Sequence, residues 1–99
     1  MLKYHFTRAA DDDLENIWFY GLDTWGVEQA DRYYQQIINM VEHLSENPQH
    51  GKSEAIIVEN LRSYPSGSHR IYYTPEESGY ITIVRVLHQS MDTERHIEN

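Results

Sequence analysis

The sequence predicts a single α+β domain spanning residues 1–99, in which a helix hairpin packs on one face of a mostly antiparallel sheet. Two observations predict this fold. Apolar residues recur at helical spacing through most of residues 8–46, and three short strand-like runs follow between residues 61 and 87. Because the strand runs come together after the helical ones, they predict a three-stranded antiparallel meander and not alternating parallel units. The length of 99 residues suits one domain.

The first 26 residues predict a short strand followed by a helix. Residues 2–6 alternate apolar and polar side chains, which is the period of a half-buried strand. The Thr7 hydroxyl can then accept a hydrogen bond from a free N–H in the first helical turn. The acidic run Asp11–Asp13 lies near the positive end of that helix dipole, so a solvated helix start explains it better than a cation site. Gly26 ends the helix. The expected core stripe comprises Leu14, Ile17, Trp18, Gly21, Leu22 and Trp25.

A second helix is expected from about Val27 to Asn47, where Pro48 pushes the preceding residue out of helical geometry. The two helices form an antiparallel hairpin, because the connection between them is too short for another arrangement. The core stripe of the second helix comprises Ala30, Tyr34, Ile37, Val41 and Leu44, with Tyr33 and Ile38 beside it.

The second half of the chain predicts the meander. Residues 50–60 are expected to form a loop or an irregular strand, and strands are expected at about 61–64, 70–74 and 80–87. Turns rich in proline, glycine and serine separate these strands. With the helix hairpin on one face, the other face of the sheet is expected to stay available to a partner.

Composition favours a protein partner over a nucleic acid. Eight basic and sixteen acidic residues give a net charge of −8, whereas nucleic-acid binding depends on cations that neutralise phosphates. The absence of cysteine excludes disulfides and thiolate metal sites. No apolar run approaches the ~20 residues of a membrane span, and the first residues lack a secretory signal. A cytoplasmic protein without membrane contact is expected.

Common enzyme motifs are absent from the sequence. It contains no phosphate-binding loop, no glycine-rich nucleotide fingerprint, no H-E-x-x-H helix and no G-x-S-x-G turn. The sequence therefore favours a binding protein over an enzyme, and no cofactor is expected.

Residues from Tyr4 to about Asp92 resemble the ParE branch of the RelE/ParE toxin superfamily. The segments that carry this resemblance are Asn47-Pro48, Gly51-Lys52, Leu61-Arg62-Ser63, Gly67-Ser68-His69, Val86-Leu87-His88-Gln89 and Met91-Asp92. The resemblance implies the fold predicted above and a toxin of a type II toxin–antitoxin pair. It also implies that the toxin binds DNA gyrase and traps it on cleaved DNA, and that a ParD-like antitoxin neutralises it in a hetero-oligomer.

Two features depart from that pattern. The net charge of −8 is more acidic than expected for a toxin that must bind an acidic antitoxin. Tyr64 stands where a Phe-type residue is usual before the proline of the hairpin. A member of the superfamily that has lost its toxicity is a weaker alternative.

A second function is implied by the ribonuclease members of the superfamily. In those members a carboxylate or lysine acts as base, an arginine stabilises the phosphate and a histidine or tyrosine assists the leaving group. Glu54, Arg70 and His88 resemble that set and define the alternative of a ribosome-dependent mRNA endoribonuclease. We favour the simpler hypothesis that Arg70 and His88 are ordinary polar residues on the open face of the sheet.

Two groups of residues are candidates for partner contacts. The segment after the last strand is expected to leave the sheet at an exposed edge, which makes His88, Gln89, Met91 and Asp92 candidates for contacting the target. Phe19, Tyr20 and Tyr72 are out of phase with the core stripes, and exposed aromatics are favoured interface anchors. These three are candidates for contacting the antitoxin.

Two polar features near the C-terminus have competing interpretations. Arg85 lies in the middle of the last strand, where it is expected to form a salt bridge with a helix carboxylate or to contact the antitoxin. His88, Asp92 and His96 are spaced at i, i+4 and i+8, which would align metal ligands if the tail were helical. A solvated, frayed chain end is the favoured interpretation, so no metal site is expected.

Overall fold

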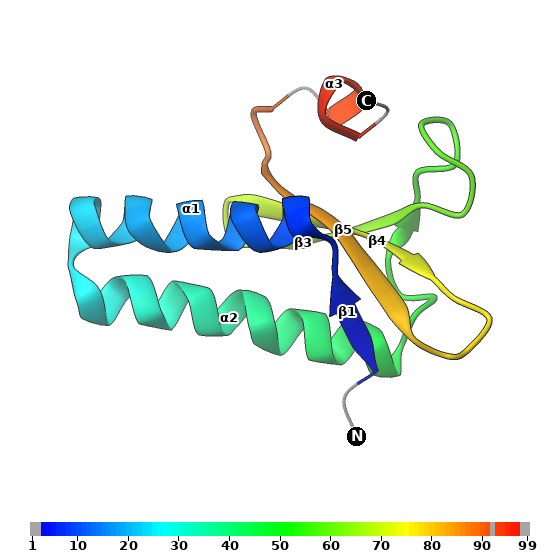
Figure 1. Ribbon diagram of the computed structural model, residues 1–99, viewed down its shortest axis with the longest axis horizontal. Helices are drawn as coiled ribbons and strands as arrows, with labels where there is room; N and C mark the ends of the chain where they lie inside the picture. Colours follow the sequence, from blue (N-terminus) through cyan, green and yellow to red (C-terminus); the bar gives the residue numbers. More distant parts are fainter. Residues whose placement is uncertain (1–2, 92, 98–99) are drawn as a thin grey trace.

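The computed structural model describes residues 3–91 and 93–97 and confirms the α+β fold (Figure 1). The helix hairpin consists of α1 (Arg8–Trp25) and α2 (Val27–Glu46), and a short α3 (Thr93–Ile97) follows the sheet. The five strands are β1 (Tyr4–Phe6), β2 (Lys52–Ser53), β3 (Arg62–Ser66), β4 (His69–Pro75) and β5 (Ile81–His88). Their order across the sheet is β1-β5-β4-β3-β2, with β1 parallel to β5 and the other neighbours antiparallel. The meander β3–β4–β5 is the predicted one.

Local capping fixes the helix hairpin as the sequence predicts. The Thr7 hydroxyl accepts a hydrogen bond from Ala10 N at 3.1 Å and donates one to Val84 O at 2.8 Å, so it caps α1 and also ties the start of this helix to β5. Gly26 has φ +95°, a conformation that favours glycine, and it is the one residue between α1 and α2. The chain therefore reverses direction within a single residue.

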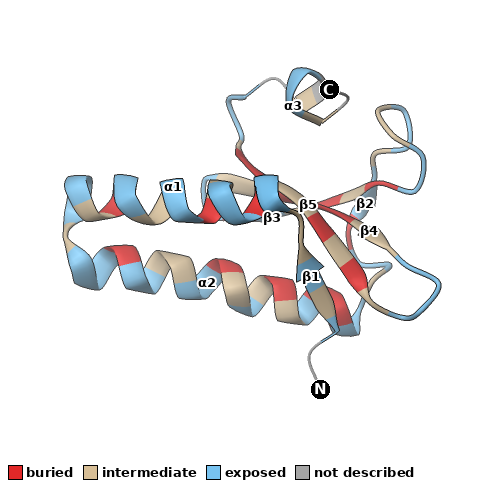
Figure 2. Ribbon diagram, in the orientation of Figure 1, coloured by how far each residue is buried: buried red, intermediate tan, exposed pale blue. Residues whose placement is uncertain are grey.

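The main core lies between the hairpin and the sheet (Figure 2). Tyr73 is fully buried there, and its hydroxyl donates to Pro48 O and accepts from Gly51 N. This pair of bonds satisfies the one polar atom of the side chain, as burial requires. The buried members of this core are Ala10, Leu14, Ile37, Val41, Leu44, Ile71, Tyr73, Ile81, Ile83 and Val86.

The opposite face of the sheet carries a second apolar cluster, and the expectation that this face stays available to a partner is wrong. Leu61, Tyr72 and Leu87 are buried there. Ile97 of α3 packs against them, together with Ile57, Val58 and Val84. The chain therefore covers this cluster with its own 54–60 loop and its C-terminal helix. Tyr72 is only 5% exposed, so its expected exposure is also wrong.

The aromatic residues near the hairpin turn differ in part from the expected core. Trp25 is 54% exposed although it follows the helical stripe, because the hairpin extends beyond the sheet at its turn (Figure 1). Trp18, Tyr33 and Tyr34 are half-buried, and Tyr20 is exposed. No helix in the described part of the chain is both long and apolar enough to cross a membrane.

Candidate functional site

A pocket of about 480 Å³ opens between the hairpin and the ends of β4 and β5. We call it the His69–His88 pocket. It combines apolar and polar walls, which is typical of recognition sites. Its lining residues are Asp13, Asn16, Ile17, Tyr20, Trp25, Tyr33, Ser68, His69, Val86, His88 and Met91.

The two histidines face each other across neighbouring strands. His69 and His88 are direct partners in the register of β4 and β5, and their ring centroids lie 5.3 Å apart. Tyr33 Oη is 2.6 Å from His69 Nδ1 and accepts a hydrogen bond from Ser68 N. His88 Nδ1 accepts a bond from Ser90 N, which places the proton of the neutral ring on Nε2. These bonds hold both imidazole rings in fixed orientations.

His69 is kept neutral by its surroundings. Burial lowers the pKa of His69 from its ordinary value, and the nearby His88 lowers it further, while Asp13 acts in the opposite direction. At neutral pH the His69 ring is therefore predominantly uncharged, and it contributes a neutral hydrogen-bonding group to the pocket.

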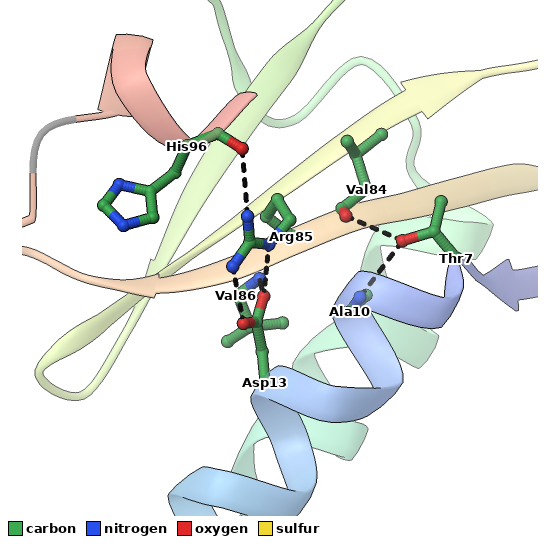
Figure 3. Close-up of polar contacts among 7 residues, drawn as sticks. All are labelled: Thr7, Ala10, Asp13, Val84, Arg85, Val86 and His96. Atoms are coloured by element: carbon green, nitrogen blue, oxygen red, sulfur yellow. Dashed lines mark hydrogen bonds and ion pairs between the residues drawn. The ribbon is translucent and has the colours of Figure 1, made fainter. Parts of the chain in front are cut away.

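One wall of the pocket is anchored by an ion pair between α1 and β5 (Figure 3). Asp13 accepts two bonds from the Arg85 guanidinium, at 2.7 and 2.8 Å, and a third from Val86 N at 2.9 Å. Arg85 Nη1 also donates to His96 O, so the same side chain holds α3. The bonds to Asp13 raise the pKa of Arg85. The expected salt bridge of Arg85 to a helix carboxylate is confirmed. The solvated interpretation of the acidic run is wrong for Asp13.

Two of the three residues that resemble a ribonuclease set are brought together, and the third is not. Ser63 Oγ donates to Glu54 Oε2 at 2.5 Å and accepts from Arg70 Nη1 at 3.1 Å, so Glu54 and Arg70 meet at Ser63. His88 pairs with His69, the residue next to Arg70 in β4. Since successive side chains of a strand point to opposite faces, His88 lies on the other face of the sheet. The base and the cation of this set therefore lie on one face of the sheet, and the acid lies on the other.

The segment proposed to contact the target lies at the mouth of the pocket and follows the end of β5 that β1 does not reach. β1 pairs with β5 only as far as Ile83, whereas β4 pairs with it up to His88, and Gln89 N continues that pairing by donating to Ser68 O at 3.0 Å. Gln89 is exposed and Met91 is 46% exposed. Asp92 lies outside the described residues.

The spacing proposed for metal ligands does not align side chains in this fold. His88 ends β5, whereas His96 belongs to the separate helix α3, so the two do not share a helix face. Asp92, the third residue of that hypothesis, lies outside the described residues. No group of three or more metal-ligating side chains occurs within residues 3–91 and 93–97.

The three aromatic candidates for antitoxin contact do not form one patch. Phe19 and Tyr20 are 53% and 66% exposed, as expected, but they flank different hollows on α1. Tyr72 is buried on the opposite face of the sheet, where its hydroxyl lies 2.8 Å from Thr93 Oγ1. Arg85 is held by Asp13 and His96.

Sequence reasoning missed His69 and Tyr33 as parts of the site. In the sequence, His69 stands out only as part of the Gly67-Ser68-His69 segment, and Tyr33 only as a residue beside the core stripe of the second helix. The strand register would have identified His69 as the partner of His88. That register shifts between Tyr72 and Tyr73, where Val84 is an extra residue in β5, so counting from the turn gives the wrong partner.

Comparisons with known proteins agree with this fold. Residues 4–93 match the family model for the ParE toxin of the type II toxin–antitoxin system parDE. Toxin ParE1 of Mycobacterium tuberculosis is 36% identical over 95 residues, which cover 96% of this chain and 97% of that protein. Toxin ParE1 of Caulobacter vibrioides is 36% identical over 97 residues, covering 98% and 99% of the two chains.

A solved structure of the chromosomal ParDE toxin–antitoxin system from P. aeruginosa has a similar chain. Its TM-score is 0.74 at 25% sequence identity, and the match covers 89% of this chain and 96% of that one. The family match spans both the helix hairpin and the meander, so it includes every wall of the His69–His88 pocket. The protein belongs to the ParE toxin family of type II toxin–antitoxin systems.

Proposed function

We propose that this protein inhibits DNA gyrase by binding to it in the cytoplasm, and that a cognate ParD-like antitoxin neutralises it in a hetero-oligomer. Membership of the ParE family supports DNA gyrase as the target. The similar chain from P. aeruginosa belongs to a ParDE system, which supports an antitoxin partner.

The observation that favours a binding mechanism over a catalytic one is the separation of His88 from Glu54 and Arg70. General acid–base cleavage of RNA needs its groups within hydrogen-bond reach of one reacting centre. Here Glu54 and Arg70 are engaged with Ser63 on one face, while His88 pairs with His69 on the other. This arrangement supports a protein that acts by occupying a surface of its target.

The contact with gyrase is assigned to the mouth of the His69–His88 pocket. His88 and Met91 line this pocket, Gln89 lies exposed beside them, and Asp92 follows in the sequence. Methionine is a flexible apolar side chain suited to recognition surfaces. Tyr20 lines the same pocket, so an antitoxin segment seated on Tyr20 would cover His88 and Met91. Neutralisation would then be steric, because antitoxin and target compete for one surface.

The test is a gyrase assay run beside an RNA assay. Purified protein is incubated with gyrase, supercoiled plasmid and ATP, and cleaved plasmid is quantified. The same protein is added to a translation extract, in which mRNA integrity is followed. Accumulation of cleaved plasmid with intact mRNA is expected. Degraded mRNA with unaffected gyrase would refute the proposal.

A matched pair of variants connects this assay to the structure. His88→Gln changes the proposed contact surface, whereas Arg70→Gln changes the opposite face. His88→Gln is expected to reduce gyrase trapping by about tenfold or more if it is an interface anchor. Arg70→Gln is expected to leave the trapping of gyrase unchanged. If Arg70 were a catalytic cation, its loss would lower the rate of mRNA cleavage by about 100-fold. Equal loss in both variants, with both folded by circular dichroism, would contradict the assignment.

A further inference from the structure

Two histidines meet at the C-terminal end of α2, at the opposite end of the hairpin from its turn. His43 belongs to the last turn of α2, and His50 lies in the turn that leads to β2. His43 Nε2 is 3.4 Å from His50 Nδ1, and the ring centroids are 4.9 Å apart. Both side chains are exposed, and they line a hollow of about 670 Å³. We call them the His43–His50 pair.

The His43–His50 pair is separate from the His69–His88 pocket. His43 lies about 15 Å along the axis of α2 from Tyr33, at a rise of about 1.5 Å per residue. The hollow at the pair and the His69–His88 pocket share no lining residue. The pair is therefore not used by the surface to which the gyrase contact is assigned.

The separation of the two nitrogens matches that of two ligands of one metal ion. Zn²⁺ binds imidazole nitrogens at about 2.0–2.1 Å, and a tetrahedral angle between two such bonds places the nitrogens about 3.3–3.4 Å apart. His43 Nε2 and His50 Nδ1 are separated by 3.4 Å. Two rings at this distance can accept an ion between them without a change in their spacing.

Tyr64 determines which nitrogen of His50 is available to a metal. His50 Nε2 lies 3.3 Å from Tyr64 Oη, and the two rings lie edge to face with centroids 4.9 Å apart. When Nε2 carries the proton and donates it to Tyr64 Oη, Nδ1 keeps its lone pair free. Metal-binding histidines usually donate their other ring N–H to an acceptor in this way, which fixes the tautomer and the orientation of the ring. The Tyr64 hydroxyl is therefore a positioning group for His50.

Hydrogen bonds hold the backbone between the two histidines in place. Asn47 donates from its backbone N and from Nδ2 to His43 O, at 3.0 Å in each case. His50 N donates to Asn47 O at 3.0 Å, and the hydroxyl of the buried Tyr73 donates to Pro48 O at 2.8 Å. Because this turn is already ordered, a metal that joins the two rings costs little conformational entropy.

We propose that the His43–His50 pair binds a divalent transition-metal ion of the Zn²⁺ class, with His43 Nε2 and His50 Nδ1 as its two protein ligands. Imidazole nitrogen suits Zn²⁺, Cu²⁺ and Ni²⁺, whereas Mg²⁺ and Ca²⁺ prefer oxygen ligands. No third histidine or carboxylate joins the pair within residues 3–91 and 93–97, so water or a donor from another molecule completes the coordination. The bound ion links the end of α2 to the turn before β2.

Calorimetric titration of the full chain with Zn²⁺, on protein without an affinity tag, tests the proposal. We expect saturable binding of one Zn²⁺ per chain and no binding of Mg²⁺ at the same concentrations. Tm should rise with Zn²⁺ concentration, because the folded chain brings the two rings together. In NMR spectra the imidazole resonances of His43 and His50 should be the ones that shift. Absence of saturable Zn²⁺ binding would show that the pair forms a hydrogen bond only, and would overturn the proposal.

Matched histidine variants locate the ion. His43→Gln and His50→Gln each remove one ligand from an exposed position and are expected to weaken Zn²⁺ binding by about tenfold or more. The control His5→Gln removes an exposed histidine that stacks on Tyr80, and it should leave the affinity for Zn²⁺ unchanged. Circular dichroism without metal checks that each variant is folded. Equal weakening in the control, or loss of binding in His88→Gln alone, would refute the site.

Tyr64→Phe tests the positioning role of the hydroxyl. The aromatic ring is kept, while the hydrogen-bond partner of His50 Nε2 is lost. The affinity for Zn²⁺ is expected to fall by about tenfold, as is typical when an outer-shell partner of a metal ligand is removed. The stoichiometry should stay at one ion per chain, because both ligands remain. An affinity equal to that of the parent would show that Tyr64 does not orient His50.

Discussion

Asp13 of α1 and Arg85 of β5 lie 72 residues apart in the sequence and form a two-point ion pair with N–O distances of 2.7 and 2.8 Å. β1 pairs with β5 only as far as Ile83, so the backbone of β5 has no strand neighbour on that side at Val86. Asp13 takes the place of that strand by accepting a bond from Val86 N. One carboxylate therefore holds the hairpin against the sheet where the strand pairing ends.

Replacing Asp13 with Asn is expected to destabilise the fold by about 2–3 kcal/mol. The change leaves the guanidinium of Arg85 largely buried without a counter-charge, and the discount from a fully buried pair reflects the 20% and 13% exposure of the two side chains. Urea unfolding followed by circular dichroism measures the change. Asp12→Asn, at an exposed neighbour, is the control and is expected to stay within about 0.5 kcal/mol of the parent. Coinciding midpoints for the two variants would contradict this role of the ion pair.

His69 makes the stability of the fold depend on pH. Its pKa is lowered in the folded state, first by burial and then by His88, so the unfolded chain binds a proton more readily. The contribution of His69 to the free energy of unfolding is then complete above the unfolded pKa of about 6.5, and it decreases as the pH falls below that value. The decrease ends once the pH is below the folded pKa. Urea midpoints between pH 5 and 8 are expected to show this loss, and His69→Gln is expected to reduce it. In His88→Gln, an NMR titration should find the pKa of His69 closer to its ordinary value. An unchanged pKa would show that His88 does not contribute.

Local rules predicted the hairpin well, because its determinants are close in the sequence. Thr7, Gly26 and Asn47 occupy the expected helix ends, and Ile37, Val41 and Leu44 are buried as expected. The meander was also predicted, with boundaries that differ by about one or two residues. Neither result needs information on how distant segments pack.

The errors arose where packing between distant segments decides the outcome. Tyr72 was out of phase with the core stripe, but burial on the second face by α3 could not be deduced from strand period alone. The position of Asp13 in an acidic run concealed its pairing with Arg85. The parallel pairing of β1 with β5 places the first part of the C-terminal strand inside the sheet, whereas residues 84–88 have no strand neighbour on that side.

Gly67 and Gly79 provide a comparison between backbone strain and steric conflict. Both have positive φ, at +60° and +92°, so alanine is strained at either position. A Cβ at Gly79 meets nothing within 4 Å, whereas one at Gly67 would lie 2.7 Å from the Tyr33 ring. Gly79→Ala is expected to cost about 1 kcal/mol and Gly67→Ala about 1–2 kcal/mol more. Urea unfolding measures both, and NMR of His69 should report a disturbed Tyr33 contact only in Gly67→Ala. Equal costs would show that Tyr33 moves aside freely.

The C-terminal helix is expected to stabilise the fold without forming the gyrase contact. Deleting residues 93–99 removes Ile97 from the Leu61–Tyr72–Leu87 cluster and the bond from Arg85 to His96 O. Exposure of this apolar surface is expected to lower stability by about 2–3 kcal/mol, whereas Ile97→Ala alone should cost about 1 kcal/mol, because the side chain is only partly buried.

The same truncation retains residues 88–92, so the folded fraction is expected to trap gyrase as the full chain does. Met91→Ser has the opposite expected profile, because the Met91 side chain is 46% exposed at the mouth of the His69–His88 pocket. It should leave the free energy of unfolding within about 0.5 kcal/mol of that of the parent and reduce the trapping of gyrase. Plasmid cleavage and circular dichroism, measured on both variants below their unfolding transitions, separate the two roles. Loss of trapping in the folded truncation, with full trapping by Met91→Ser, would move the target contact from the pocket to α3.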